Sequence, residues 1–327
     1  MKYFRDIFKE REEVSVRYDA QHSAVWLYLN PKDRPRYSMQ MLQSMRSTQK
    51  SVMTYFQKST VVSKYPVKYF VFASQVKGIY NYGGDLAHFA QMIINKERKQ
   101  LQEYAHTCID IVYLSAVNLN SPLTTITLLE GDALGGGFES ALSTSVLITE
   151  ENVKMGFPEI RFNMFPGMGA YSFLARYHGM KFAEEIISSG KIYSAKMLYE
   201  KGVVTKLAKT GNGIETVQKY MKKHSQSSNG MQGLQKVQQI YDPLSYEKLI
   251  QITDLWVETA LKITDKDIKM MYKLVSAQNG KNINHNKVRT PYDRRIFDTN
   301  TQNPFVDASN QKVFHDRRVK EDRRVIA

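Results

Sequence analysis

The feature that most limits how this chain can fold is a pattern that occurs twice: a run of strand-forming residues, a turn containing glycines, and a helical segment. The first copy has its strand at residues 67–74 and its glycines within 78–84. The second has its strand at 124–129 and its glycines within 131–137. Because repeated strand–turn–helix units build sheets that are covered by helices, the pattern predicts a βα-repeating architecture of the α/β class.

Further elements extend this pattern on both sides. Asp85 stands where the first of these helices begins, and a short carboxylate at that place is suited to cap the helix. The other predicted elements are an apolar strand at 24–29, helices at 37–57, 101–112, 245–263 and 265–278, and a polar connector at 222–232. We therefore divide the chain into an irregular N-terminal lead-in (1–20), a core (21–205), a C-terminal helical region (206–280) and a basic, flexible tail (281–327).

Composition excludes several classes of protein. Hydrophobic residues make up 42% of the 327 residues and charged residues 24%, which is close to a globular average and sufficient for a buried core. No apolar run approaches the roughly 18 residues needed to cross a bilayer, and the charged N-terminus lacks the apolar segment of a secretory signal. Cys108 is the only cysteine, which excludes an internal disulfide and disfavours a zinc site. We expect a cytoplasmic protein without a bound metal.

The chain is strongly basic, with 46 Lys and Arg against 32 Asp and Glu and a formal net charge of +14. Such an excess suits an anionic partner, which can be nucleic acid, anionic lipid, a phosphorylated ligand or an acidic protein. The tail at 281–327 contributes eleven basic and six acidic side chains. This mixture of signs disfavours nucleic acid.

The two glycine turns are candidates for holding an anion. Residues 131–137 follow neither the G-x-G-x-x-G nor the Walker pattern, so a nucleotide cofactor is not expected. The glycines at 135–137 allow close approach to the backbone, and they enter a helix whose first N–H groups lack intrahelical partners. Gly83 and Gly84 stand at the equivalent place in the first copy. One N–H from each turn can hold a single carbonyl oxygen, as a thioester enolate requires; ordinary turn glycines are the alternative.

Two glutamates stand near the second turn. Glu139 follows the glycine run directly, and Glu159 comes 20 residues later in a stretch rich in phenylalanine and methionine. Acid–base work at an unactivated carbon needs one group that takes a proton and another that gives one. Two carboxylates in an apolar cleft can divide these roles because their surroundings separate their pKa values. Solvated glutamates without a catalytic function are the alternative.

Four motifs, in this order, resemble the crotonase (enoyl-CoA hydratase/isomerase) superfamily across residues 20–280. They are Asn-Tyr-Gly-Gly-Asp-Leu at 81–86, Ala-Leu-Gly-Gly-Gly-Phe-Glu at 133–139, Gly-Phe-Pro-Glu at 156–159 and Phe-Pro-Gly-Met-Gly-Ala at 165–170. The resemblance implies a ββα spiral core followed by a C-terminal helical oligomerisation region. Within the superfamily, residues 82–87, 134–143 and 165–173 are most similar to the diffusible-signal-factor synthases, which make cis-2-unsaturated fatty acid signals.

The resemblance also implies roles for individual residues. Gly84 and Gly136 match the amides of the family's oxyanion hole, and Glu139 and Glu159 match its two catalytic glutamates. The residues that we expect to line the substrate pocket are Gly135, Phe138, Phe162, Met168 and Tyr171. The implied reaction dehydrates a medium-chain 3-hydroxyacyl thioester on acyl carrier protein to the cis-2-enoyl thioester. Hydrolysis of that thioester then releases the fatty acid signal.

Two other functions stay open at this point: an ordinary enoyl-CoA hydratase/isomerase, and a crotonase scaffold that acts mainly through a regulatory protein partner. No cofactor is expected beyond the phosphopantetheine of acyl carrier protein or the CoA that carries the substrate. Carrier proteins are acidic, so the basic surface of this chain suits such a donor. The resemblance further implies a homotrimer or a dimer of trimers, and a regulatory sensor protein is another candidate partner.

Overall fold

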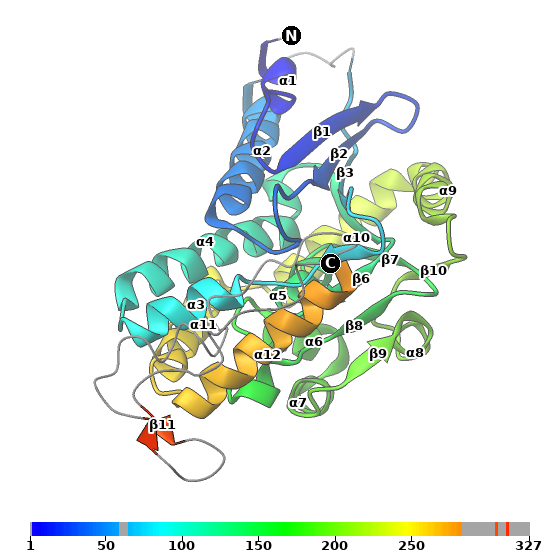
Figure 1. The fold of residues 1–327 in the computed structure, drawn as a ribbon. Helices are drawn as coiled ribbons and strands as arrows, with labels where there is room; N and C mark the ends of the chain where they lie inside the picture. Colours follow the sequence, from blue (N-terminus) through cyan, green and yellow to red (C-terminus); the bar gives the residue numbers. More distant parts are fainter. Residues whose placement is uncertain (1, 59–64, 283–304, 307–311, 314–327) are drawn as a thin grey trace, which may run out of the picture. The chain divides into compact units, whose positions relative to one another are not determined.

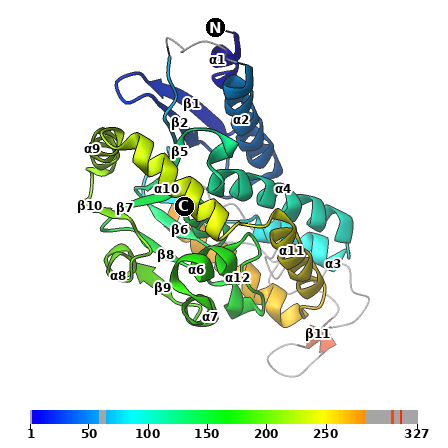
Figure 2. The ribbon, with the colours of Figure 1, turned by 180° about the vertical axis from the view of Figure 1, so that it is seen from behind.

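The computed structural model describes residues 2–58, 65–282, 305–306 and 312–313, and Figures 1 and 2 show it from opposite sides. The chain forms two compact units, residues 1–271 and 272–327. In the second unit, β11 (Phe305–Val306) pairs with β12 (Lys312–Val313) in an antiparallel ladder. Most of the tail that the sequence predicts to be flexible lies outside the described residues.

Six strands form the main sheet, in the order β1-β2-β3-β5-β7-β10. They are β1 (Val14–Asp19), β2 (Ala24–Leu29), β3 (Tyr69–Ser74), β5 (Thr124–Leu129), β7 (Val146–Glu150) and β10 (Lys206–Ala208). β1 and β2 are antiparallel, and the other neighbouring strands are parallel. Every residue of β5 is buried, as expected for a parallel strand that is covered on both faces. The predicted strands at 24–29, 67–74 and 124–129 are thereby confirmed.

A smaller sheet has four strands, in the order β4-β6-β8-β9. They are β4 (Ile79–Asn81), β6 (Asp132–Leu134), β8 (Lys154–Gly156) and β9 (Ile192–Ser194). Each of β3, β5 and β7 in the main sheet is followed along the chain by one strand of the smaller sheet and then by a helical segment (Figure 1). The repeating unit is therefore ββα, which confirms the expected spiral core. The parallel pairing of β4 with β6 places their two glycine turns at the same edge.

Helices surround the two sheets. In the first unit they are α1 (Lys2–Ile7), α2 (Met39–Lys58), α3 (Leu86–Ile94), α4 (Arg98–Ala116), α5 (Gly136–Leu142), α6 (Ala170–His178), α7 (Met180–Ser188), α8 (Ala195–Glu200), α9 (Gly213–Ser225), α10 (Ser228–Tyr241) and α11 (Tyr246–Ala260), with α12 (Asp265–Asn282) continuing into the second. α4 packs against both α2 and α11 (Figure 2). Asp85 caps α3 as predicted, its Oδ1 accepting the N–H of His88 at 3.2 Å. Within the described residues, no helix has the length and apolar character that crossing a bilayer requires.

The N-terminal lead-in is not irregular, which corrects the expectation for residues 1–20. It contains α1 and β1, and β1 pairs along its whole length with β2. The guanidinium of Arg11 donates to the carbonyls of Ile7 and Asp6 at the end of α1 and to the hydroxyl of Ser51 on α2. The charged side chains that made this segment look unstructured therefore fasten it to the core.

The polar connector expected at 222–232 is also wrong, because this stretch contains the end of α9 and the beginning of α10. The amides of Gln232, Gln235 and Gln239 donate to oxygen atoms of the core, at distances of 3.2–3.4 Å. These glutamines lie three and four residues apart, so they form one helix face. A polar inward face is uncommon, and for that reason the hydrophobic pattern did not reveal this helix.

Candidate active site

The two glycine turns that the sequence singles out lie against each other. A Cβ added to Gly83 would lie 2.7 Å from the backbone N of Gly136, and one added to Gly136 would lie 3.6 Å from the backbone N of Gly84. Gly83 has φ +88°, a conformation that side chains other than glycine rarely adopt. The two turns therefore pack too closely for any side chain between them. Gly84 and Gly136, the two residues predicted to form the oxyanion hole, lie close together as a result.

The N–H groups of Gly84 and Gly136 are available to a ligand. Gly136 is the first residue of α5, where helical N–H groups have no intrahelical acceptor. The neighbouring amides are engaged, since the N–H of Gly135 donates to the carbonyl of Gly156 and the N–H of Glu139 to that of Gly135. No hydrogen bond within residues 2–58 and 65–282 uses the N–H of Gly84 or Gly136. Both amides can therefore donate to one external oxygen.

Glu139 lies on α5 and is almost completely buried, with 2% of its surface exposed. Its Oε1 accepts the N–H of Met168 at 2.7 Å and that of Ala170 at 3.1 Å. Gly169 lies between them with φ +108°, the left-handed turn that directs both amides toward the carboxylate. Burial raises the pKa of Glu139 to about 7, and the two N–H donors act in the opposite direction. The carboxylate is therefore partly ionised near neutral pH.

Glu159 opens the 3-10 turn η2 (Glu159–Phe162), which follows β8. Its Oε1 lies so close to Gly135 that a Cβ added there would come within 2.4 Å of it. Its Oε2 is buried and has no hydrogen-bond partner in the described part of the chain. Burial first, and the negative charge of Glu139 second, raise the pKa of Glu159 well above its usual value. Both effects favour the protonated form of this side chain.

The two glutamates lie on either side of Gly135. The carbonyl of Gly135 accepts the N–H of Glu139 at 3.0 Å, while its α-carbon adjoins the carboxyl of Glu159. Two like charges so near each other in an apolar site favour a single shared proton. Two N–H groups from another turn stabilise the anion of Glu139, whereas Glu159 has only its own backbone N–H to lower its pKa, so the shared proton favours Glu159.

The residues predicted to line the substrate pocket fall into two groups. Gly135 and Met168 border the site. Gly135 adjoins the carboxyl group of Glu159, and a Cβ added to Gly136 would lie 2.8 Å from the sulfur of Met168. Phe138 is fully buried, and its ring stacks on that of Phe157 at 4.9 Å. Phe162 is also buried. The hydroxyl of Tyr171 donates to Glu184 on α7, at 3.2 Å. For these residues, contact with substrate stays a prediction.

Sequence reasoning missed an aromatic pair beside the site. Phe89 lies against Gly84, where an added Cβ would be 2.4 Å from its ring, and Trp256 lies against Gly167 in the same way at 2.5 Å. The two rings are 5.4 Å apart and nearly perpendicular. Phe89 belongs to the periodic stretch after Asp85, but nothing in the sequence connects Trp256, on α11, with the glycine turns.

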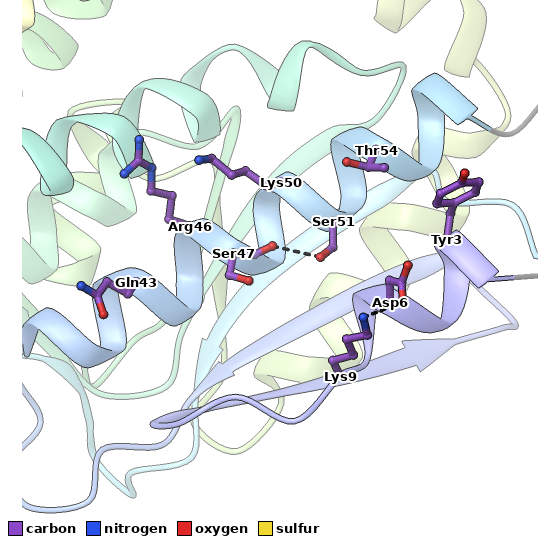
Figure 3. A pocket seen from close by; sticks show the side chains of 9 residues that line it. All are labelled: Tyr3, Asp6, Lys9, Gln43, Arg46, Ser47, Lys50, Ser51 and Thr54. Atoms are coloured by element: carbon purple, nitrogen blue, oxygen red, sulfur yellow. Dashed lines mark hydrogen bonds and ion pairs between the residues drawn. The ribbon is translucent and has the colours of Figure 1, made fainter.

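A separate hollow of about 430 Å³ lies between α1 and α2 (Figure 3). Lys9 and Arg46 both line it, but Lys9 pairs with Asp6 at 3.0 Å and Arg46 with Asp110 at 2.6 Å. It contains neither glutamate of the site. In the described part of the chain, no group of three or more acidic, histidine or cysteine side chains is arranged to hold a metal ion.

The ββα repeat and its paired glycine turns define the crotonase fold. The chain matches the Enoyl-CoA hydratase/isomerase family over residues 48–279 and belongs to that family.

Among its curated relatives, mitochondrial methylglutaconyl-CoA hydratase of Homo sapiens is 30% identical over 139 residues, covering 42% of this chain and 39% of that protein. The enoyl-CoA isomerase/hydratase fer4 of Mycosarcoma maydis is 32% identical over 127 residues, covering 38% of this chain and 44% of that protein. The chain thus spans about two fifths of the length of the curated relatives it matches.

Solved structures share the fold over a longer part of the chain. An enoyl-CoA hydratase from Bacillus halodurans superposes with a TM-score of 0.67 at 17% identity, covering 80% of this chain and 100% of that one. Pseudomonas aeruginosa DspI superposes with a TM-score of 0.61 at 16% identity, covering 84% of this chain and 96% of that one. At these identities, the likeness concerns the fold alone.

Proposed function

We propose that the chain is an acyl-thioester hydratase/dehydratase that adds water to, or removes it from, the Cα–Cβ bond of its substrate. One observation carries this proposal: two buried carboxyl groups, Glu139 with two N–H donors and Glu159 with no partner for its Oε2, lie beside two backbone amides that have no acceptor within the described residues. Either glutamate alone would suffice for moving one proton. Addition or elimination of water requires a donor and an acceptor together.

The mechanism follows from these positions. The thioester carbonyl oxygen accepts the N–H groups of Gly84 and Gly136, which stabilise the negative charge that develops when the enolate forms. In the dehydration direction, Glu139 takes the proton from Cα and Glu159 gives its proton to the departing hydroxyl. Afterwards Glu139 is protonated and Glu159 is ionised. The hydration direction begins from this second state and reverses both transfers. An amide of this kind, or an acid, typically contributes about two or three orders of magnitude in rate.

The finer proposal concerns the substrate. We propose a medium-chain 3-hydroxyacyl group on acyl carrier protein, dehydrated to the cis-2-enoyl thioester and then hydrolysed to release a fatty acid signal. The similarity of residues 82–87, 134–143 and 165–173 to diffusible-signal-factor synthases supports it. The net charge of +14 supports an acidic carrier as donor. An ordinary enoyl-CoA hydratase/isomerase, as the name of the matched family suggests, is the second candidate.

Two assays on the purified full chain separate these candidates. One follows the absorbance of crotonyl-CoA, and the other analyses products from 3-hydroxydodecanoyl-acyl-carrier-protein by mass spectrometry. The finer proposal expects loss of water and free unsaturated acid from the carrier-protein substrate. Activity with crotonyl-CoA alone indicates the ordinary hydratase. Activity with neither substrate contradicts the enzyme proposal and favours a scaffold that works through a regulatory partner.

We also propose that the chain assembles into trimers. α10, labelled in Figure 2, supports this proposal because it carries exposed apolar side chains. Leu234, Val237 and Tyr241 are 62%, 59% and 90% exposed. Exposed apolar stripes of this kind mark interaction surfaces. Sedimentation of the wild type and of a Leu234→Ser/Val237→Ser variant tests it. Trimers are expected for the wild type and smaller species for the variant.

A further inference from the structure

Tyr37 lies directly before α2 and contacts the first glycine turn through its backbone. Its N–H donates to the carbonyl of Gly83 at 2.8 Å, which makes a short parallel bridge to that turn. Its own carbonyl accepts the hydroxyl of Tyr104 at 2.6 Å. Only 1% of Tyr37 is exposed. Hydrogen bonds therefore hold both the N–H and the carbonyl of this residue, the first to Gly83 and the second to Tyr104.

The side chain of Tyr37 reaches the second glycine turn. Its hydroxyl lies 2.5 Å from the Oγ of Ser140, and that Oγ donates to the carbonyl of Gly137 at 3.0 Å. Ser140 follows Glu139 on α5. One tyrosine thus joins the turn that carries the Gly84 amide to the helix that begins with the Gly136 amide.

The bond between Tyr37 and Ser140 connects parts of the chain that are far apart in the sequence. The two turns are about 50 residues apart in the sequence, and they belong to neighbouring strands, β4 and β6. The pairing of these strands shifts register between Ile79 and Asn81, so the ladder alone does not fix the last residues before each turn. Asn81 supplies one local support, accepting the N–H of Gly83 at 2.7 Å. The tie across the two turns is a cluster at Ser140, where the hydroxyl of Tyr37 meets Ser140 and that of Tyr80 on β4.

We infer that Tyr37 is a positioning residue, which sets the separation of the Gly84 and Gly136 amides through its bonds to Gly83 and Ser140. The inference rests on the proposed function, in which both amides hold the thioester oxygen. Stabilisation of a developing oxyanion depends on donors already held at hydrogen-bond distance from it. A displacement of about 1 Å at such a site can cost about 100-fold in rate. Loss of the hydroxyl should therefore weaken catalysis more than it weakens folding.

The test removes this hydroxyl and, separately, a matched one. Tyr37→Phe deletes the bond to Ser140. Tyr55→Phe deletes the hydroxyl of another buried tyrosine, on α2, where Tyr55 donates to the carbonyl of Tyr65 at 2.8 Å. Each variant is assayed with crotonyl-CoA and with the carrier-protein substrate, alongside its melting temperature. We expect Tyr37→Phe to lower kcat about 10-fold or more, with KM changed little, and Tyr55→Phe to leave both constants near wild type.

A second readout does not need turnover. Acetoacetyl-CoA forms an enolate that absorbs in the near ultraviolet, and a well-placed pair of amides favours that anion. We expect the wild type to increase this absorbance on binding, and Tyr37→Phe to increase it less. Ser140→Ala should also lower this signal, and the double variant should lose less than the sum of the two single losses, because both substitutions remove the Tyr37–Ser140 bond.

The outcomes separate the two proposals. If the wild type forms the enolate but turns over neither thioester, the proposed function fails, and the comparison of enolate signals still decides the role of Tyr37. If Tyr37→Phe matches Tyr55→Phe in kcat and in enolate signal, the hydroxyl has only a packing role and the inference is wrong. If the wild type binds no acyl thioester, both proposals are contradicted.

Discussion

Glu139 and Glu159 lie in one site, yet their surroundings differ in the two respects that determine a proton's position. Glu139 receives two backbone N–H groups from the turn before α6, whereas the buried Oε2 of Glu159 receives none within the described residues. Glu139 projects from a helix, and Glu159 from a single 3-10 turn. The difference shows how one fold makes a base and an acid from the same residue type.

The largest expected effect comes from removing either carboxyl group while keeping its shape. Glu139→Gln and Glu159→Gln should each lower kcat about 100- to 10,000-fold, because the amide neither takes nor gives the proton. Steady-state kinetics on the preferred thioester would measure this. The double variant should be little worse than the single ones, since the pair acts as a unit. A single variant with more than a tenth of wild-type activity would show that its glutamate is not needed.

A smaller loss is expected when Glu159 is displaced rather than replaced. In Gly135→Ala, the new methyl group would meet the Oε1 of Glu159 at 2.4 Å, and we expect kcat to fall about 100-fold. Gly78→Ala is the matched control, because Gly78 also has positive φ but has no atom within 4 Å of its added Cβ. Equal losses of kcat in the two variants would indicate that backbone strain, and not displacement of Glu159, causes the loss.

The contrast between the two carboxyl groups also predicts a pH profile. Glu139 must be ionised to take a proton, so kcat/KM should rise about tenfold per pH unit below its pKa of about 7 and level off above it. Glu159 must be protonated, so the rate should fall again above its own, higher pKa. Initial rates from pH 5 to 10 would show a bell. A flat profile between pH 5 and 8 contradicts the assignment of Glu139 as the base.

The smallest expected effect is on stability. The folded chain keeps the proton of Glu159 at pH values where the unfolded chain has lost it, so the free energy of unfolding falls as pH rises above about 4.5. Glu159→Gln removes this dependence. The variant should be more stable than the wild type at pH 8 and equal to it near pH 4. Urea unfolding at both pH values measures this.

The control for that measurement is Glu151→Gln, an exposed glutamate on a turn. Its substitution should change the free energy of unfolding by less than about 0.5 kcal/mol at either pH. If Glu159→Gln behaves in the same way, the carboxyl of Glu159 is ionised in the folded chain and the proton assignment fails.

Much of the fold follows from local pattern. The strands at 24–29 and 124–129 coincide with β2 and β5 because continuous apolar runs suit strands buried on both faces. The predictions of an irregular segment at 1–20 and a connector at 222–232 are wrong because polar side chains there, such as Arg11 and Gln232, form hydrogen bonds with distant residues. Hydrophobic spacing along the sequence predicts buried helices and strands, but it does not indicate which polar side chains form hydrogen bonds with residues far away in the sequence.

By itself, the sequence determined which chemical groups are present: two glycine turns at the starts of helices and two glutamates in an apolar stretch. The tertiary structure alone decided that the two turns touch, that Tyr37 bonds to both Gly83 and Ser140, and that Trp256 packs on Phe89. It also decided that the surroundings of the two glutamates affect their pKa values differently. The reason is that a pKa depends on burial and on nearby donors, and those of Glu139 come from a turn about 30 residues further along the chain.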